Sequence, residues 1–225
     1  MDFPGLTPLL VTAQLSAVTT LVLILIGTPL AWWLSFSRNR FRPAVEAVVA
    51  MPLVLPPTVL GFYLLLAMAP ETPLGRAWFT LTGTTLAFSF SGLVVASAIY
   101  SLPFYVQPLT AAFSRLGRET LETAANLGAS PTATFLRVVL PQCRQGFVVA
   151  SILAFAHTVG EFGVVLMVGG NIPGVTRVAS IAVYDHVEAL QLTEAHVLSA
   201  ILLVFSFIVL LIVYVYLGRR RAMLA

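Results

Sequence analysis

The chain has 225 residues, of which 59% are hydrophobic and only 9% are charged, and its mean hydropathy is +0.97. A soluble domain carries about 25% charged residues, so this composition excludes an ordinary soluble protein. The net charge of +3 is no nucleic-acid signature, because the arginines lie at the ends of apolar runs. Lysine is absent, and a phosphate-binding P-loop requires one. The chain therefore cannot hydrolyse ATP through a P-loop.

Five apolar stretches are each long enough to cross a bilayer, which takes roughly 20 predominantly apolar residues in a helix. We predict an all-α integral membrane protein, a polytopic helical bundle in which residues 1–225 form one transmembrane domain. The stretch Val175–Leu190 is too polar to span, and we expect a short helix on the outer surface there. The predicted spans are 11–36, 44–69, 85–113, 146–168 and 195–217.

The distribution of arginine predicts the orientation of these spans. Ten arginines fall in segments 37–43 and 114–145 and in the C-terminal tail, whereas Arg76 and Arg177 fall on the other side. Cytoplasmic loops carry an excess of positive side chains. We therefore predict that the N-terminus lies outside the cell membrane and that the C-terminus lies in the cytoplasm.

The second predicted span is interrupted by Pro52, Pro56 and Pro57. Proline has no amide hydrogen, so the carbonyls four residues earlier lose their helical partners. Non-helical backbone at membrane depth must face protein or water. Two interpretations remain open: a kink that only packs against other helices, and a break that lines a translocation path, as in many transporters. On the second interpretation the path includes Pro56, Pro57 and Thr58.

The fourth predicted span carries His157 and Glu161, which are four residues apart and so share a helical face. Ala150, Ala154 and Thr158 lie on the same face and allow a neighbouring helix to approach closely. An intramembrane glutamate is expected to face the bundle or a cavity. Three roles remain open: a His157–Glu161 pair, a cap on another helix, or a gate. No His-Glu-x-x-His or cysteine cluster accompanies these residues, so we predict no metal site.

The cytoplasmic segment 114–145 is predicted to contain two short helices joined by a tight turn. Along the first helix, Arg115 with Glu119 and Arg118 with Glu122 are oppositely charged pairs four residues apart. Such pairs stabilise a helix that lies in water, which is the environment expected at the membrane surface.

Gly128 marks the turn, because glycine suits the position just after a helix C-terminus. Ser130 and Pro131 then supply an N-cap and a first-turn proline for the second helix, which we expect Pro141 to end. An apolar face runs along both helices and requires a partner. It comprises Leu121, Ala124, Ala125, Phe135 and Leu136.

The residues from Glu122 to Pro141 resemble the EAA motif of ABC importer permeases, E-A-A-x3-G-x9-I-x-L-P. Thr123 replaces an alanine of the motif and Val138 its isoleucine, while the other motif positions keep their spacing. The resemblance implies the MetI-like permease fold, in which this coupling loop, residues 114–145, docks into a groove of a separate ATPase subunit. It assigns coupling to Glu122, Thr123, Ala124, Gly128, Ala129, Ser130, Pro131, Leu140 and Pro141.

Four further segments, 27–31, 52–58, 160–163 and 171–177, look like those of the permease subunits of molybdate importers. Sulfate and thiosulfate permeases share related forms of several segments, so the choice of molybdate over tungstate, sulfate or thiosulfate rests on the resemblance. Membership implies a multi-pass protein of the bacterial inner membrane. It also implies a homodimer, two cytoplasmic ATPase subunits that bind ATP and Mg²⁺, a periplasmic oxyanion-binding protein, and no cofactor on this chain.

Two other classes of function account for fewer features of the sequence. A secondary transporter or channel would explain the broken second span and the His157–Glu161 face, but it leaves the coupling loop unexplained. An intramembrane enzyme is disfavoured, because no nucleophile–base pair or metal-ligand set stands out, and we predict no catalytic residues. No arginine lies at the centre of a predicted span, so we expect selectivity for the anion to reside in the binding protein.

Overall fold

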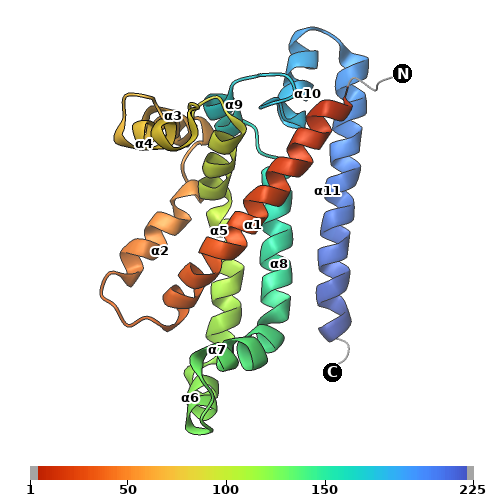
Figure 1. Cartoon of the computed structure of the whole chain (residues 1–225). Coiled ribbons are helices and arrows are strands. Elements are labelled where there is room, and N and C mark those ends of the chain that lie inside the picture. Colours follow the sequence, from red (N-terminus) through yellow and green to blue (C-terminus); the bar gives the residue numbers. More distant parts are fainter. Residues whose placement is uncertain (1–4, 222–225) are drawn as a thin grey trace.

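The computed structural model describes residues 5–221, with side chains as far as Val215, and the regular elements in this range are all helices. Helix α1 (Leu6–Phe36) begins at the end of the bundle opposite to that where α11 (Leu192–Arg221) finishes (Figure 1). The predicted all-α fold is confirmed. The side chains of Arg219, Arg220 and Arg221, which contributed to the predicted orientation, lie outside the described part.

Four helical segments are long and apolar enough to cross a membrane, and a bent helix pair makes a fifth if it counts as one span. An odd number of passes agrees with the placement of the two helix ends at opposite ends of the bundle (Figure 1). Two of the long segments are α1 and α11. The other two are α5 (Phe90–Leu116) and the continuous helical stretch Pro131–Val159.

The second span is sharply bent, as its prolines predict. Helix α2 (Arg42–Ala50) continues through a 3₁₀ turn, η1 (Met51–Leu53). The helix axis then bends by 112° before α3 (Pro57–Ala67). Up to the bend the segment is only roughly 18 Å long at about 1.5 Å per residue. The segment 44–69 therefore does not run as one straight helix, in agreement with the interruption predicted at its prolines. Helix α3 turns sideways and projects from the bundle together with α4 (Pro73–Thr82) (Figure 1).

The fourth span begins and ends earlier than predicted. Helix α8 (Leu140–Val159) ends at Gly160, the next two residues leave helical geometry, and a separate short helix, α9 (Gly163–Gly169), follows. The prediction of one span over 146–168 is wrong on this point. The polar stripe is nevertheless buried as expected, since Ala150, Ala154 and Thr158 are almost inaccessible.

The centre of the bundle is built around α5, which packs against both α1 and α8. Its fully buried side chains include Tyr105, Leu109 and Phe113. Gly27 of α1 makes room for the Tyr105 ring, because a Cβ at this glycine would lie 2.6 Å from the ring. The Tyr105 hydroxyl forms a 2.9 Å hydrogen bond with Thr28, so the close contact also satisfies a buried polar group.

The coupling loop forms α6 (Arg118–Asn126), α7 (Pro131–Thr134) and a π turn, η2 (Phe135–Val139), that runs directly into α8. Pro141 was predicted to end the second helix, and this is wrong. The amide of Leu140 donates to the carbonyl of Phe135, five residues earlier. This wider turn interrupts the usual four-residue ladder, so a proline next to it is accommodated without breaking the helix.

At the opposite end of the bundle, α10 (Ala179–Glu188) is the short helix predicted within Val175–Leu190. Its first residue is fixed to α1, because the Ala179 amide donates to Thr12 Oγ1 at 2.8 Å. A buried hydrogen bond between residues far apart in the chain therefore joins the start of α10 to the first span.

Candidate functional site

The turn of the coupling loop has the hydrogen bonds of a Schellman motif. The amide of Ala129 donates to the carbonyl of Ala124 at 3.0 Å, and the amide of Gly128 donates to that of Ala125 at 2.9 Å. Gly128 has a φ of +79°, which a side chain with a Cβ adopts only under strain. The predicted turn is confirmed, and it fixes the direction in which the next helix starts.

The start of α7 is also as predicted. Ser130 Oγ accepts a hydrogen bond from the Ala133 amide at 3.2 Å, and Pro131 occupies the first turn. Most of the residues assigned to coupling by the motif are exposed at this end of the bundle, whereas Ala129 is half-buried and Ala124 is buried. The exposed ones are Glu122, Thr123, Gly128, Ser130, Pro131, Leu140 and Pro141.

The two predicted ion pairs do not form among the described residues. Gly117, with φ +76° and ψ 161°, separates α5 from α6, so Arg115 and Glu119 do not share a helix. Arg118 instead donates from its guanidinium to the carbonyl of Phe36 at the end of α1. Arg118 thus binds a main-chain carbonyl of α1 instead of the carboxylate of Glu122 on its own helix.

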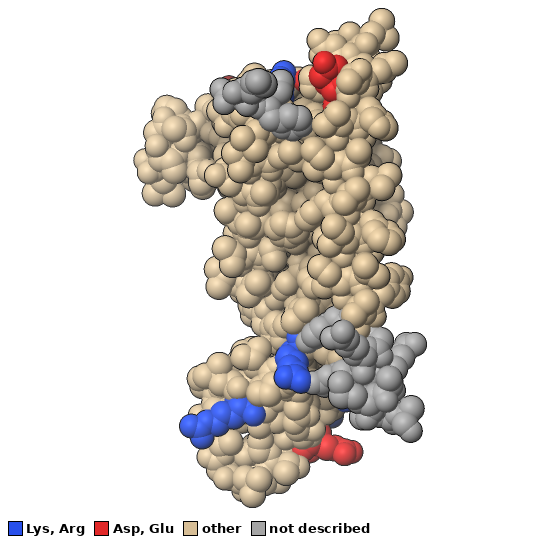
Figure 2. Space-filling model, turned by 90° about the vertical axis from the view of Figure 1, so that its right-hand side faces the viewer, with Lys and Arg blue, Asp and Glu red and all other residues tan. Residues whose placement is uncertain are grey.

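The apolar face of the coupling loop is divided between the inside and the outside of the molecule. Leu121 and Phe135 pack against the buried core, and Ala124 is 8% exposed. Leu136 is 55% exposed and Leu127, which follows α6, is 83% exposed. Part of the face is therefore covered by this chain, and the remaining apolar side chains are available to another protein. On the face shown in Figure 2, the charged side chains gather toward the two ends of the bundle.

A cavity of about 520 Å³ lies between the bent second span and the region where α8 gives way to α9. It brings together four of the five predicted path residues, which are Pro57, Thr58, His157 and Glu161. Pro56 does not line it but precedes the first turn of α3. The break in the second span and the polar residues of the fourth span therefore belong to one site.

His157 is held by α5 rather than by Glu161. Its Nδ1 forms a 2.9 Å hydrogen bond with Ser101 Oγ, and its ring stacks on Phe104 with centroids 3.8 Å apart. The Tyr100 ring lies on the same wall, 4.8 Å from the imidazole. The His157–Glu161 pair, one of the three roles left open, does not form, because Glu161 lies beyond the end of α8 and no longer follows the helical spacing.

Glu161 is only 3% exposed, and neither carboxyl oxygen has a hydrogen-bond partner among the described residues. Its main-chain carbonyl accepts from Ser180 Oγ at 2.6 Å, which ties the segment to α10. The carboxyl group therefore caps no helix in the described part of the chain. Burying a carboxyl group without hydrogen-bond partners costs free energy. Glu161 is therefore the residue of this cavity for which packing alone gives the least explanation.

Two glycines, Gly61 and Gly163, bring the cavity walls together, a packing role that the sequence did not predict for either. A Cβ on Gly163 would lie 2.8 Å from Cβ of Pro57, and one on Gly61 would lie 2.7 Å from Cβ of Met167. These contacts join α9 to α3 across the bend. In the sequence, both glycines lie within a few residues of the predicted path residues. That they allow close packing follows only from the fold, because the segments they join are far apart in the chain.

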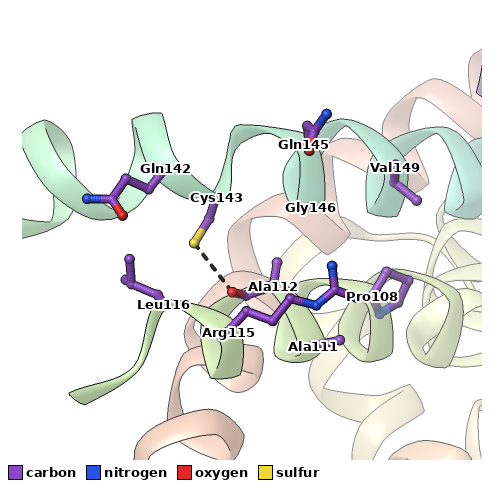
Figure 3. A pocket seen from close by; sticks show the side chains of 10 residues that line it. All are labelled: Pro108, Ala111, Ala112, Arg115, Leu116, Gln142, Cys143, Gln145, Gly146 and Val149. Carbon is purple, nitrogen blue, oxygen red and sulfur yellow. Dashed lines mark hydrogen bonds between the residues drawn. The ribbon is translucent and has the colours of Figure 1, made fainter. Parts of the chain in front are cut away.

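A second cavity, of about 430 Å³, lies between α5 and α8 near the coupling loop and was not predicted. Figure 3 shows Arg115 along the α5 wall, with Cys143 and Gln145 on the α8 wall. Cys143 is buried and its Sγ donates to the Ala112 carbonyl at 3.7 Å. Part of the lining, including Arg115, Gln142 and Cys143, lies within residues 114–145, the segment that the motif assigns to ATPase docking.

These features, a bundle of membrane-crossing helices, a broken helix lining a cavity and an exposed helix–turn–helix loop, can be compared with known proteins. The family described as the binding-protein-dependent transport system inner membrane component matches residues 7–222. The chain belongs to this family. The MetI-like permease fold predicted from the motif is thereby confirmed, and the chain is an inner-membrane component of a binding-protein-dependent transport system.

Similar proteins within the family are named as permeases of molybdenum transport systems or of sulfate transport systems. The molybdenum transport system permease protein ModB of Azotobacter vinelandii is 55% identical over 203 residues, covering 90% of each chain. ModB of Escherichia coli is 32% identical and covers 82% of this chain and 81% of its own. The sulfate transport system permease protein CysT of Synechocystis is 35% identical over 87% of this chain and 69% of its own.

Proposed function

We propose that this protein is the membrane-spanning permease subunit of an ATP-driven importer that moves molybdate into the cytoplasm. The observation that carries the proposal is the 55% identity to the Azotobacter molybdenum permease over 90% of both chains. The match to a sulfate permease is lower, at 35% identity. Sulfate or thiosulfate is therefore the second candidate, and tungstate resembles molybdate too closely in charge and shape to be separated from it by identity.

The exposed coupling loop supports docking to an ATPase. Its turn is fixed by backbone hydrogen bonds, and it exposes the apolar side chains of Leu127 and Leu136 as well as the carboxylate of Glu122. A rigid loop that exposes apolar side chains fits a protein interface better than a solvated connection. ATP and Mg²⁺ belong to that partner, and this chain contributes no catalytic residue.

A homodimer is the arrangement that we infer for transport. The bend in the second span leaves Val54 and Tyr63 largely exposed, at 85% and 64%, and Pro57 and Thr58 of the same bend line the cavity that contains Glu161. A second copy placed against this side would enclose the cavity between two bent helices. The cavity has no arginine in its lining, which supports a weakly binding passage with selectivity supplied by a periplasmic binding protein.

We test the function by reconstituting the permease in liposomes with its ATPase and binding protein. The measured quantity is uptake of molybdate, tungstate and sulfate, with ATP or with a non-hydrolysable analogue. We expect ATP-dependent uptake of molybdate in preference to sulfate. Preference for sulfate would favour the second candidate, and uptake that does not depend on ATP would overturn the proposal in favour of a secondary transporter.

We infer that the coupling loop faces the cytoplasm and that α4 lies on the periplasmic side. Single cysteines at Asn39 and Ala129, in a Cys143→Ser background, should resist impermeant thiol reagents in intact cells. A cysteine at Thr72 should react. The opposite labelling pattern would invert the orientation without affecting the fold.

A further inference from the structure

The last turn of α1 is a point where three parts of the molecule meet. The Trp32 ring lies 5.3 Å from Phe113 of α5 and 5.9 Å from Phe135 of the π turn, both at steep edge-on angles. It also lies 4.6 Å from Phe36 on its own helix. Edge-to-face packing of this kind stabilises beyond the area it buries. One side chain thus joins the first span, the central helix and the coupling loop.

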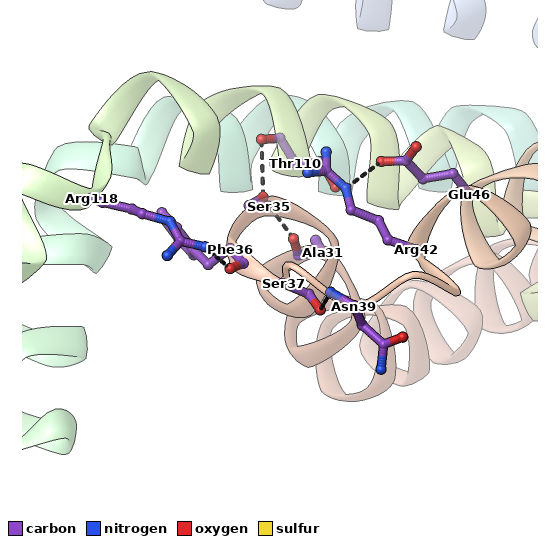
Figure 4. A network of polar contacts seen from close by, with 9 residues as sticks. All are labelled: Ala31, Ser35, Phe36, Ser37, Asn39, Arg42, Glu46, Thr110 and Arg118. Atoms are coloured by element: carbon purple, nitrogen blue, oxygen red, sulfur yellow. Dashed lines mark hydrogen bonds and ion pairs between the residues drawn. The ribbon is translucent and has the colours of Figure 1, made fainter.

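Polar contacts fasten the same turn from two sides (Figure 4). Ser35 Oγ lies 2.7 Å from the carbonyl oxygen of Ala31 and 3.2 Å from that of Thr110 in α5, so its single hydroxyl hydrogen is shared between these two acceptors. Arg118, the first residue of α6, donates to the carbonyl of Phe36. A cation at the carbonyl end of a helix is favourable, because these carbonyls have no helical partners.

The covalent connections of the coupling loop make these contacts significant. At one end the loop leaves α5 through Gly117, a glycine with positive φ that interrupts the helix. At the other end it continues through the π turn into α8. The contacts of Trp32 and Arg118 form a third attachment, and this one leads to a helix that is distant in sequence.

We propose that the end of α1, residues Trp32 to Phe36, moves as one body with the coupling loop, and that Trp32 is the positioning residue that transmits displacement of the loop to the first span. This inference rests on the proposed ATP-driven function. If ATP binding moves the docked loop, the attachment at Trp32 moves α1, which packs along α5 and α8. Without it, the loop could move about Gly117 while the first span stayed in place.

The first test compares two neighbouring tryptophans. Trp32→Ala removes the ring contacts with α5 and the π turn. Trp33→Ala removes an equally large side chain that also packs against the buried core but, among the described residues, stacks on neither Phe113 nor Phe135. We expect Trp32→Ala to lower molybdate transported per ATP hydrolysed by roughly five-fold or more, the lower range of energetic coupling between sites. The ATPase should still co-purify. Trp33→Ala and Trp32→Phe should each retain most of the coupling.

The second test replaces the aromatic contact with a covalent one. Trp32→Cys with Phe135→Cys, in a Cys143→Ser background, should be uncoupled when reduced. Joining the two thiols with a short bifunctional reagent should restore transport per ATP toward the wild-type value. A merely structural role for Trp32 would give no such recovery, and further loss of transport on cross-linking would show that the two elements must move apart.

The outcomes separate this inference from the proposed function. If the wild-type complex shows no ATP-dependent uptake, the proposed function fails. If the wild type is coupled and Trp32→Ala equals it, only the inference fails. Should Trp32→Ala not accumulate in the membrane, Arg118→Gln provides the remaining test, because it removes the bond to Phe36 from an exposed position. Wild-type coupling in that variant together with no rescue by cross-linking would overturn the inference.

Discussion

Two of the breaks in the helical backbone, the turn of the coupling loop and the bend of the second span, are stabilised in different ways. In the coupling loop, the turn at Gly128 is closed by hydrogen bonds between residues a few positions apart. In the second span, the bend at Pro56 is held by packing of α3 against α9, more than a hundred residues later in the chain. The first break can keep its shape in water, as a docking surface must. The second depends on packing between segments far apart in the chain, which is compatible with the proposed role in lining a passage.

The largest effect is expected from straightening the second break. Replacing Pro56 and Pro57 with alanine restores two amide donors and so permits a continuous helix through the bend. The cavity wall formed by Pro57 and Thr58 would then move, and we expect ATP-dependent uptake to be lost while the protein still inserts and binds the ATPase. Uptake and co-purification are measured in the same preparations. Normal uptake would show that the bend serves packing only.

A smaller effect is expected from filling the contact that holds this bend. A Cβ on Gly163 would lie 2.8 Å from the rigid ring of Pro57, so Gly163→Ala must displace α3 from α9. Overpacking of this kind costs about 1–3 kcal/mol, and we expect a lower unfolding temperature and reduced uptake. Gly160→Ala is the control, because its nearest neighbours would be 3.8 Å away. Equal stability of both variants would contradict the packing argument.

Gly128 of the coupling loop and Gly83, which follows α4, have similar backbone geometry, so together they allow backbone strain to be separated from function. Gly128 and Gly83 have φ of +79° and +71°, and a Cβ on either would meet no atom within 4 Å. Aspartate at either position should cost about 1–2 kcal/mol in backbone strain. We expect only Gly128→Asp to weaken ATPase association or to uncouple hydrolysis from transport. A matching loss in Gly83→Asp would mean that strain alone is responsible.

The contrast between the two regions also explains what the sequence could predict. Gly128, Ser130 and Pro131 act through neighbours within five residues, so their roles were visible in the sequence. The partner of His157 is Ser101, and it was not visible, because helix packing alone brings these residues together. The prediction that Pro141 ends a helix was wrong for a related reason. The helix continues past this proline because a π turn precedes it, and the sequence did not predict that turn. The family motif identified the coupling loop, while the cavity required the fold.

The smallest effect is expected from Glu122, an exposed side chain of α6. Removing an exposed carboxylate changes the stability of a protein by about 0.5 kcal/mol or less, so any larger effect must come from a partner. A hydrogen bond to a charged group is worth about 1.5 kcal/mol or more, which corresponds to roughly a ten-fold change in affinity. We therefore expect Glu122→Ala to weaken ATPase binding by about this factor.

The matched control for this prediction is Glu119→Ala, which removes another exposed glutamate from the same helix. The Glu119 carbonyl accepts a 2.8 Å hydrogen bond from Thr123 Oγ1, and this bond survives the substitution because it involves the main chain. Both variants lose one negative charge, so a general electrostatic effect would weaken ATPase binding equally in the two. Binding lost only in Glu122→Ala would instead identify a specific contact on this face of α6. Unchanged binding in both would remove Glu122 from the docking surface and leave the fixed turn at Gly128 as its defining feature.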